Sequence, residues 1–372
     1  MNTIAHRLDL SALDGANPLG FLCALGIVHV MSASDSTARL GWKRTARWTP
    51  FLQSQKTLDE NSVVQMLAEH LRGTAVHPEA EKERAASQSK LDDAKKKLKD
   101  ALAAFKKRKL RGKEREAAWQ KEIEPLRRRL SGVRSRYLAT LRQAVPSPEL
   151  AIGQPPDCTI EEFRGHARAL LTDAAVNRRT AVDLLAAFGA ETVSDSEARI
   201  EATPFCFITG GGHQWFLDTA RQLMTVANPK RVQDALFHPW AYADEKLSMR
   251  WDPIDDRRYA LLDRDPTASD NKSRTVWMAN LLAYRALAFY PCSLIESKGH
   301  TPGWASEFFT WPIWDSPLGT DTIRSLICHP ALGKTDLAAY RGELRARGVA
   351  TIFRSRRIRV GKYVNFSQAF VV

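Results

Sequence analysis

The sequence predicts an α+β fold that is interrupted by a long, basic helical hairpin. Short segments near both ends of the chain alternate apolar and polar residues, whereas the segments between them follow the three-and-four spacing of amphipathic helices. Strand and helix patterns follow one another without the regular β-α-β repetition of a parallel sheet, which favours the α+β class. We expect an N-terminal α+β part over residues 1–78, the hairpin over 79–145 and a C-terminal α+β part over 146–372.

The N-terminal part is expected to pair a small sheet with two helices. Residues 3–10 alternate as a strand does. Asn17 and Pro18 predict the start of a helix, because asparagine caps helices and proline suits their first position. The segments "ARLGWKR" and "ARWTPFL" predict a short hairpin, and "LDENSVVQMLAEHLRG" predicts a helix that ends at Gly73.

The C-terminal part follows a proline-rich linker, "AVPSPELAIGQPP", and is expected to mix helices with strands. Helices are predicted for "TIEEFRGHARALLTDA", "NRRTAVDLLAAFGAE", residues 229–237 and the apolar stretch "SRTVWMANLLAYRALAFYP". The segment "ATPFCFITGGGHQWFLDTARQLM" predicts a strand, a glycine-rich loop and a helix in that order. "GWASEFFTWPIWD" is rich in aromatic residues as strands are, and "GVATIFRSRRIRVGKYVNFSQAFVV" predicts a hairpin that turns at Gly361.

The positive charge of the chain is confined to the middle of the sequence. Residues 82–142 hold 21 lysine and arginine residues against eight acidic ones, and the rest of the chain holds 34 of each sign. The whole net charge of +13 therefore lies within these 61 residues. Such an asymmetry favours a polyanionic partner: nucleic acid, an anionic membrane surface or an acidic protein.

The same span has the apolar spacing of a coiled coil. Leu91, Ala94, Leu98, Ala101 with Leu102, and Phe105 form one seam, and Trp119, Ile123, Leu126, Leu130, Val133 and Tyr137 form a second. A polar break at Arg111 and Gly112 separates the two, which predicts an antiparallel helical hairpin. Pro125 lies inside the second seam, so we expect a bend or a new helix start there.

Two interpretations of this charge remain open, a solvated helical surface and a phosphate-binding surface. The excess of one sign favours the second, in which lysine and arginine bind phosphates without reading bases. The expected phosphate contacts in the hairpin are Lys95, Lys96, Lys97, Lys106, Lys107, Arg108, Lys109, Arg127, Arg128 and Arg129. Arg354 and Arg356 share one face of the C-terminal hairpin and suit equally a second phosphate strip or the charged outer face of a sheet.

Other features of the sequence limit the class of protein. The five cysteines are scattered without a CxxC pair, which indicates free thiols in a reducing compartment. The longest apolar run, residues 21–31, is too short to span a bilayer, and residues 1–10 lack the layout of a signal peptide. We therefore expect a cytoplasmic protein that needs no cofactor or metal.

No motif in the sequence has the spacing of a catalytic site. Gly210, Gly211 and Gly212 lack the flanking residues of a nucleotide-binding loop and indicate a tight turn, although the loop could hold a nucleic-acid phosphate. The segment from Asp252 to Asp265 alternates carboxylates with arginines. That pattern favours paired side chains that organise a loop, with Mg²⁺ binding as the alternative. The lone histidines His213, His238, His300 and His329 lack metal-ligand spacing, and the sequence shows no Ser-His-Asp arrangement that spacing supports.

Three stretches of the sequence resemble a known family. They are "LDGANPLGFLCALGIVHV", "GGGHQWFLDTARQL" and "HPWAYADEKLSMRWDPIDDRRYAL", and they are similar to subunits encoded with type I-U (now I-G) CRISPR systems, the putative large subunits of the Cascade surveillance complex. The similarity extends over residues 1 to about 80 and about 200 to 315, and it leaves out the basic hairpin.

The resemblance implies a noncatalytic subunit of an RNA-guided antiviral complex. Its expected partners are crRNA, target DNA, the other Cascade subunits and the separate helicase-nuclease that such complexes recruit. The resemblance also implies recognition of the target-adjacent motif, but no catalytic or motif-reading residue carries over to this chain. Two alternatives stand beside it: a metal-dependent nuclease that uses the carboxylates from Asp252 to Asp265, and an assembly protein whose basic hairpin binds an acidic partner.

Overall fold

The computed structural model describes residues 5–172, 179–192, 198–210, 214–256, 274–360 and 363–372. It divides into two compact units. One unit, Thr74–Gly153, is a helical hairpin, called the basic hairpin below. The other unit, called the body, joins Met1–Gly73 to Gln154–Val372. The predicted α+β class with an inserted helical hairpin is confirmed.

The N-terminal elements of the body match their sequence patterns. They are β1 (His6–Asp9), α1 (Pro18–Ser32), β2 (Arg39–Arg44), β3 (Trp48–Ser54) and α2 (Glu60–Arg72). The strands form an antiparallel sheet in the order β1-β3-β2. Asn17 caps α1 as predicted, because its side-chain oxygen accepts hydrogen bonds from the backbone nitrogens of Leu19 (2.8 Å) and Gly20 (3.4 Å).

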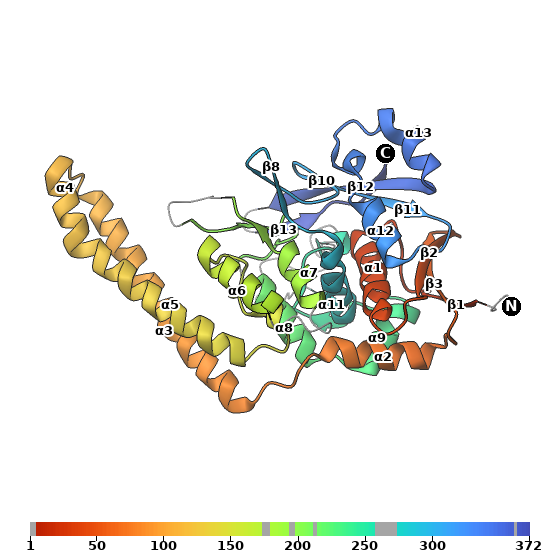
Figure 1. The fold of residues 1–372 in the computed structure, drawn as a ribbon, viewed down its shortest axis with the longest axis horizontal. Coiled ribbons are helices and arrows are strands. Elements are labelled where there is room, and N and C mark those ends of the chain that lie inside the picture. The colour runs from red at the N-terminus through yellow and green to blue at the C-terminus, as the bar shows by residue number, and fades with distance from the viewer. Residues whose placement is uncertain (1–4, 173–178, 193–197, 211–213, 257–273, 361–362) are drawn as a thin grey trace. The chain divides into compact units, whose positions relative to one another are not determined.

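Two apolar helices pack together in the body. These are α1 and α11 (Trp277–Ala286), which lie side by side in Figure 1 and are buried along almost their whole length. Gly26 permits this close approach, since a Cβ atom there would lie 1.7 Å from the carbonyl oxygen of Leu282. The apolar stretch continues as a 3₁₀ turn over Leu287–Phe289 and stops before Pro291, as predicted.

The larger sheet of the body lies near the C-terminus. It contains β10 (Trp304–Ala305), β11 (Phe308–Trp314), β12 (Val349–Val360), β13 (Tyr363–Phe366) and β14 (Phe370–Val371). The path runs β10-β11-β12-β13, and β14 also pairs with β12. The predicted hairpin is therefore present as β12 and β13, although its turn at Gly361 lies outside the described residues.

Buried tryptophans join the two ends of the chain into one unit. The indole nitrogen of Trp311 donates to the carbonyl oxygen of Gly15, and that of Trp314 donates to Leu40, both at 2.8 Å. Trp314 also packs edge-on against Trp42, with ring centroids 6.1 Å apart. The segments expected as an N-terminal and a C-terminal part therefore share one core, because their largest apolar side chains bury one another.

The body contains further helices and three short strand pairs. The helices are α6 (Ile160–Thr172), α7 (Arg179–Ala187), α8 (Phe216–Thr225), α9 (Pro229–Phe237), α12 (Thr320–Ile327) and α13 (Arg341–Ala346). Three short antiparallel pairs are β4 (Gly189–Ala190) with β5 (Glu201–Ala202), β6 (Asp244–Glu245) with β7 (Arg274–Thr275), and β8 (Ser293–Ile295) with β9 (Lys298–His300). Single 3₁₀ turns cover Pro253–Asp256, Pro330–Gly333 and Ala338–Tyr340 in the body, and another covers Pro148–Leu150 at the end of the other unit.

One predicted strand is wrong over most of its length. Before the glycine-rich loop, only β5 and a single bridge between Thr209 and Trp215 pair with other strands. Phe205, in the middle of this segment, is completely buried among aromatic rings, including that of Trp251 at 6.1 Å. Burial of the apolar side chains, and not a ladder of backbone hydrogen bonds, therefore organises this segment.

Across the described part of the chain, no helix is both long enough and apolar enough to cross a bilayer.

Candidate nucleic-acid interface

The first arm of the basic hairpin is one long helix, α3 (Pro78–Lys107). It begins where Pro78 occupies the first turn and His77 caps the free backbone nitrogens, with Nδ1 of His77 3.3 Å from the nitrogen of Glu79. Acidic residues lie in its first turn and lysines in its last turn, which suits the dipole of the helix. The dipole thus favours the cationic residues at the closed end of the hairpin.

Apolar residues along the two arms hold the hairpin together. Figure 1 shows α3 beside the return arm, which consists of α4 (Gly112–Ala118), a π-helical turn (Trp119–Ile123) and α5 (Glu124–Gln143). One cluster is built on the buried residues Leu91, Tyr137, Leu138 and Leu141, and the second on Leu98, Phe105 and Ile123. Phe105 also meets Trp119 edge-on at 5.5 Å. The two apolar seams predicted from the sequence therefore form the contact surface between the two arms.

Pro125 acts as the sequence predicted, by starting a new helix. The π-helical turn ends at Ile123, and Pro125 occupies the first turn of α5. Proline lacks a backbone N–H, and in the first turn of a helix this breaks no intrahelical hydrogen bond. The wider π-helical turn before it leaves room for its ring. The return arm is consequently divided into two helices while its apolar seam continues across the division.

The chain reverses at the closed end of the hairpin through two residues in the left-handed region. They are Lys109 (φ 50°) and Gly112 (φ 54°). Nothing lies within 4 Å of where a Cβ of Gly112 would stand, so this glycine is needed for its backbone angle and not for a close contact. The reversal brings the end of α3 next to the start of α4.

The closed end carries the highest density of positive charge in the chain. Residues 106–115 include seven lysine or arginine residues and one acidic residue, Glu114. The complete unit Thr74–Gly153 holds 21 basic and 11 acidic residues, a net charge of +10. The positive residues at this end are Lys106, Lys107, Arg108, Lys109, Arg111, Lys113 and Arg115, and all are exposed. We call this set the tip.

Six of the predicted hairpin contacts are exposed and have no ion-pair or hydrogen-bond partner in the described chain. They are Lys96, Lys97, Lys106, Lys107, Lys109 and Arg129. Lys95 is half-buried. Unpaired lysines keep their full attraction for a phosphate, because no carboxylate has to be displaced first.

The other predicted hairpin contacts already have neighbours within the hairpin. Arg108 donates to both carboxylate oxygens of Glu122 at 2.6 Å, and Arg128 pairs with Glu124 at 3.4 Å. The half-buried Arg127 lies over the ring of Trp119, with its guanidinium carbon 6.0 Å from the centroid. These pairs are at the surface and weak, so a phosphate can compete with them.

The sequence analysis did not predict which of the remaining basic residues of the hairpin are buried and which are exposed. Arg84 and Arg134 are buried, 8% and 7% exposed, and Arg84 forms a bidentate pair with Glu81. In contrast, Arg111, Lys113 and Arg115 at the tip are exposed but were not among the predicted contacts. The position of Arg84 was an available signal, since it lies seven residues before Leu91 and in register with the first apolar seam, whereas Arg134 lies beside the second seam and not on it.

The two candidates on the C-terminal sheet differ in exposure although they share a face. Phe308 on β11 lies between them, 5.7 Å from the guanidinium of Arg354 and 5.9 Å from that of Arg356. Arg354 is 8% exposed and donates to Thr310 Oγ1 (3.0 Å) and to the carbonyl oxygens of Thr335 (2.8 Å) and Lys334 (2.6 Å). Burial also lowers the pKa of Arg354.

Arg354 is therefore a structural residue, and we leave it out of the proposed interface. Its guanidinium holds the segment before α13 against the sheet, and a phosphate could reach it only if these hydrogen bonds broke. Arg356 is exposed and remains a candidate.

The carboxylate segment of the body is organised around Asp252, which is 1% exposed. Its oxygens accept hydrogen bonds from Asn17 Nδ2 (3.0 Å), the Tyr242 hydroxyl (2.8 Å) and the backbone nitrogen of Ile254 (3.0 Å). Residues 257–273, which include Asp263 and Asp265, lie outside the described residues. Within the described part, no three His, Cys, Asp or Glu side chains are placed to hold a metal ion.

Gly210 forms part of a turn, as the sequence indicated. Its φ is 107°, its nitrogen donates to the carbonyl oxygen of Gln214 at 2.8 Å, and a Cβ would lie 2.4 Å from the ring of Trp215. Both the angle and the contact require glycine. Gly211 and Gly212 lie outside the described residues.

No protein-family model matches the chain, and comparison with curated proteins finds no match.

Proposed function

We propose that the chain is a noncatalytic, nucleic-acid-binding subunit of a CRISPR RNA-guided effector complex of the Cascade type. In this role the basic hairpin binds the phosphate backbone, and the body packs on the other subunits. The resemblance of the three sequence stretches supports the assignment to such a complex, and the observation that carries the binding role is the tip, where seven positive side chains lie around a chain reversal.

The hairpin contributes affinity for nucleic acid but no sequence specificity. Lysine and arginine side chains on a helical surface neutralise phosphates and release counterions, which depends on charge density and not on base identity. Duplex DNA beside the target-adjacent motif is the proposed ligand, and crRNA or the displaced strand is the next candidate. The hairpin is not a region of family resemblance, so electrostatics alone supports its part of the proposal.

The nuclease alternative has less support than the binding role. A metal-dependent nuclease needs carboxylates directed at a metal, whereas both oxygens of Asp252 accept hydrogen bonds from the protein itself. The acidic-partner alternative uses the same tip and is separated from the proposal by experiment.

Expression of the chain with the products of its neighbouring genes tests the complex. We expect a stable assembly that contains a small RNA and that binds duplex DNA more tightly than the isolated chain does. Replacing Lys106, Lys107 and Lys109 with glutamine should weaken DNA binding and leave the assembly intact. Recovery of the chain alone, without RNA or partner subunits, would contradict the proposed role.

A further inference from the structure

A pocket in the body lies where two short strand pairs meet, β4 with β5 and β8 with β9. Its volume is about 250 Å³, and residues of both pairs line it together with Trp304 of β10 and Arg357 of β12. That volume is enough for several water molecules, and a long side chain can enter it. All the residues that line it belong to the body.

Glu201 of β5 places an unpaired carboxylate in this pocket. It is exposed and has no ion-pair or hydrogen-bond partner for its side chain among the described residues. The carboxylate lies against β9, since a Cβ on Gly299 would stand 2.8 Å from Oε2 of Glu201. Arg357, which also lines the pocket, is already engaged, because its guanidinium donates to both carboxylate oxygens of Glu307 at 2.9 Å. The pocket therefore holds one negative charge that no described ion pair neutralises.

The hairpin of β8 and β9, at the edge of the body in Figure 1, carries two exposed apolar side chains. Leu294 is 50% exposed and Ile295 is 53% exposed, and every residue from 293 to 299 is exposed. Leu294 pairs with Gly299 across the hairpin, so its side chain leaves the face of the hairpin against which Glu201 packs. Ile295 points to the opposite face. An apolar and an acidic side chain thus lie next to each other on one surface.

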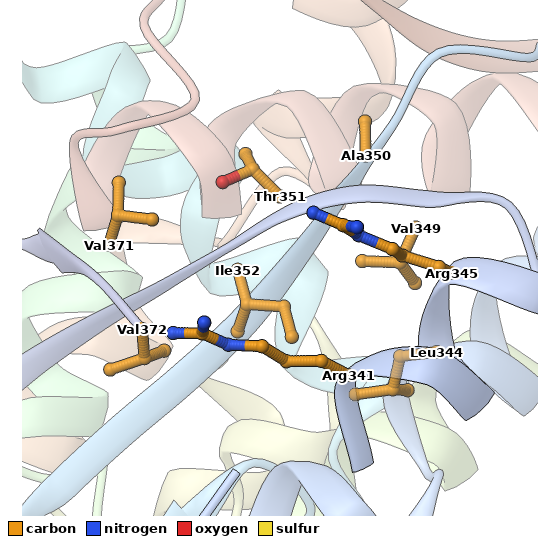
Figure 2. Close-up of a pocket in the computed structure, with 9 residues that line it drawn as sticks. All are labelled: Arg341, Leu344, Arg345, Val349, Ala350, Thr351, Ile352, Val371 and Val372. Atoms are coloured by element: carbon orange, nitrogen blue, oxygen red, sulfur yellow. The ribbon is translucent and has the colours of Figure 1, made fainter. Parts of the chain in front are cut away.

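The groove between α13 and β12 lacks this combination. It has a volume of about 140 Å³, and Arg341 and Arg345 border it (Figure 2). Leu344 and Ile352, which also line it, are 0% and 4% exposed. α13 and β12 therefore offer a partner little apolar surface there, in contrast with the hairpin of β8 and β9.

We propose that the pocket and Leu294 together bind a segment of a protein partner in which an arginine follows or precedes apolar residues. The guanidinium would enter the pocket and pair with the carboxylate of Glu201, since its planar fork matches a carboxylate bidentately. A neighbouring apolar side chain would cover Leu294 and remove it from water. The inference deepens the proposed packing of the body on other subunits, and it rests on that function only for the identity of the partner.

The charge of the pocket favours a protein segment over a nucleic acid. A free carboxylate repels phosphate, and the guanidinium of Arg357 is held by Glu307. Burial lowers the pKa of His300, which also lines the pocket, so its ring adds no positive charge at neutral pH. The exposed Leu294 contributes nothing to phosphate binding, whereas it adds buried apolar area to a complex with a peptide.

The test is selection from a displayed library of random peptides against the intact chain, followed by affinity measurements with variants. We expect enriched peptides in which an arginine stands next to apolar residues. Glu201→Gln should weaken the best of them by at least about tenfold, because it removes a charge-assisted pair. Glu69→Gln, at an exposed carboxylate on α2, removes the same charge elsewhere on the body and should leave the affinity unchanged. Citrulline in place of the arginine should cause the same loss in the original chain and little further loss in Glu201→Gln.

Two exposed apolar positions provide a second matched pair of variants. Leu294→Ser should weaken the peptide by about fivefold, whereas Ile295→Ser, which is equally exposed on the opposite face, should have little effect. Hydrogen exchange at residues 293–300 should slow when the peptide binds.

The inference is overturned if no peptide is enriched, or if the enriched peptides bind Glu201→Gln as tightly as the original chain. It is also overturned if DNA, and not the peptide, slows hydrogen exchange at residues 293–300. Failure of the chain to assemble with the products of its neighbouring genes would count against the proposed complex and not against peptide binding, so the two failures are distinguishable.

Discussion

Neutralising three tip lysines is the sharpest test of the electrostatic role of the hairpin. Lys106, Lys107 and Lys109 are exposed and without partners, so changing each to glutamine removes charge without leaving a carboxylate unpaired. Glutamine and lysine have similar helix propensities, and α3 should therefore keep its length. The seams that hold the two arms together are not touched.

The expected change follows from counterion release. Each phosphate contact contributes about 0.9 to the slope of log affinity against log salt, so losing three contacts should reduce the slope by about 2.7. A fourfold rise in salt should then weaken the original chain by roughly 40 times more than the variant. Fluorescence anisotropy of a labelled DNA duplex at several salt concentrations measures both slopes.

A matched control separates local contacts from net charge. Lys246, Lys298 and Lys334 lie in the body and are exposed, and changing these three to glutamine lowers the net charge equally. This control should retain the original slope. If the tip variant also retains it, or if the two variants lose equal amounts, the tip is not the DNA contact and the reasoning fails. Loss of binding to an acidic protein with DNA binding preserved would favour the assembly alternative.

Three further predictions concern the stability of the two units. Burial lowers the pKa of His29 to about 4, with Asp183, Arg285 and Arg324 as the nearby charges, so the unfolded chain binds a proton there more readily than the folded one. The free energy of unfolding should fall by about 3 kcal/mol as the pH drops from 6.5 to 4, and it should fall less in His29→Leu. Urea titrations at several pH values measure both dependences. Equal dependence of unfolding free energy on pH in the two proteins would contradict the prediction. Ile123→Ala should destabilise the hairpin by about 3 kcal/mol, because Ile123 is completely buried. Thermal melts of helicity detect this, with a change at the exposed Ala103, Ala103→Gly, as the comparison for helix propensity alone. An unchanged melting curve would refute the packing of Ile123 between the two arms. Gly26→Ala should cost roughly 3 kcal/mol in chemical unfolding, since its Cβ would collide with the α11 backbone, and a neutral effect would mean that α1 and α11 are further apart.

Much of the basic hairpin could be predicted from the sequence because its structure is local. The seam from Leu91 to Phe105 repeats along one helix, and the partner seam follows after a single reversal, so few arrangements satisfy both. The role of Asn17 as a helix cap was predictable for the same reason, since the cap and the nitrogens it binds are neighbours in the chain.

The candidate site was less predictable, because exposure depends on packing. Arg354 and Arg356 follow the same alternation in the sequence, yet Arg354 is buried by the segment that carries Lys334 and Thr335, and Arg356 is not. The predicted strand before Gly210 was wrong for a related reason: the aromatic residues that bury Phe205 come from distant parts of the chain.

The sequence by itself determined where the positive charge lies, which apolar seams join the two arms of the hairpin and that the chain reverses near Gly112, because these depend on composition and on contacts between near neighbours. Only the tertiary structure decided which cations of the described chain lack a partner and how the two ends of the chain share one core around Trp311 and Trp314. Those outcomes depend on which distant segments cover one another, and hydrophobic burial selects that arrangement without leaving a short pattern in the sequence.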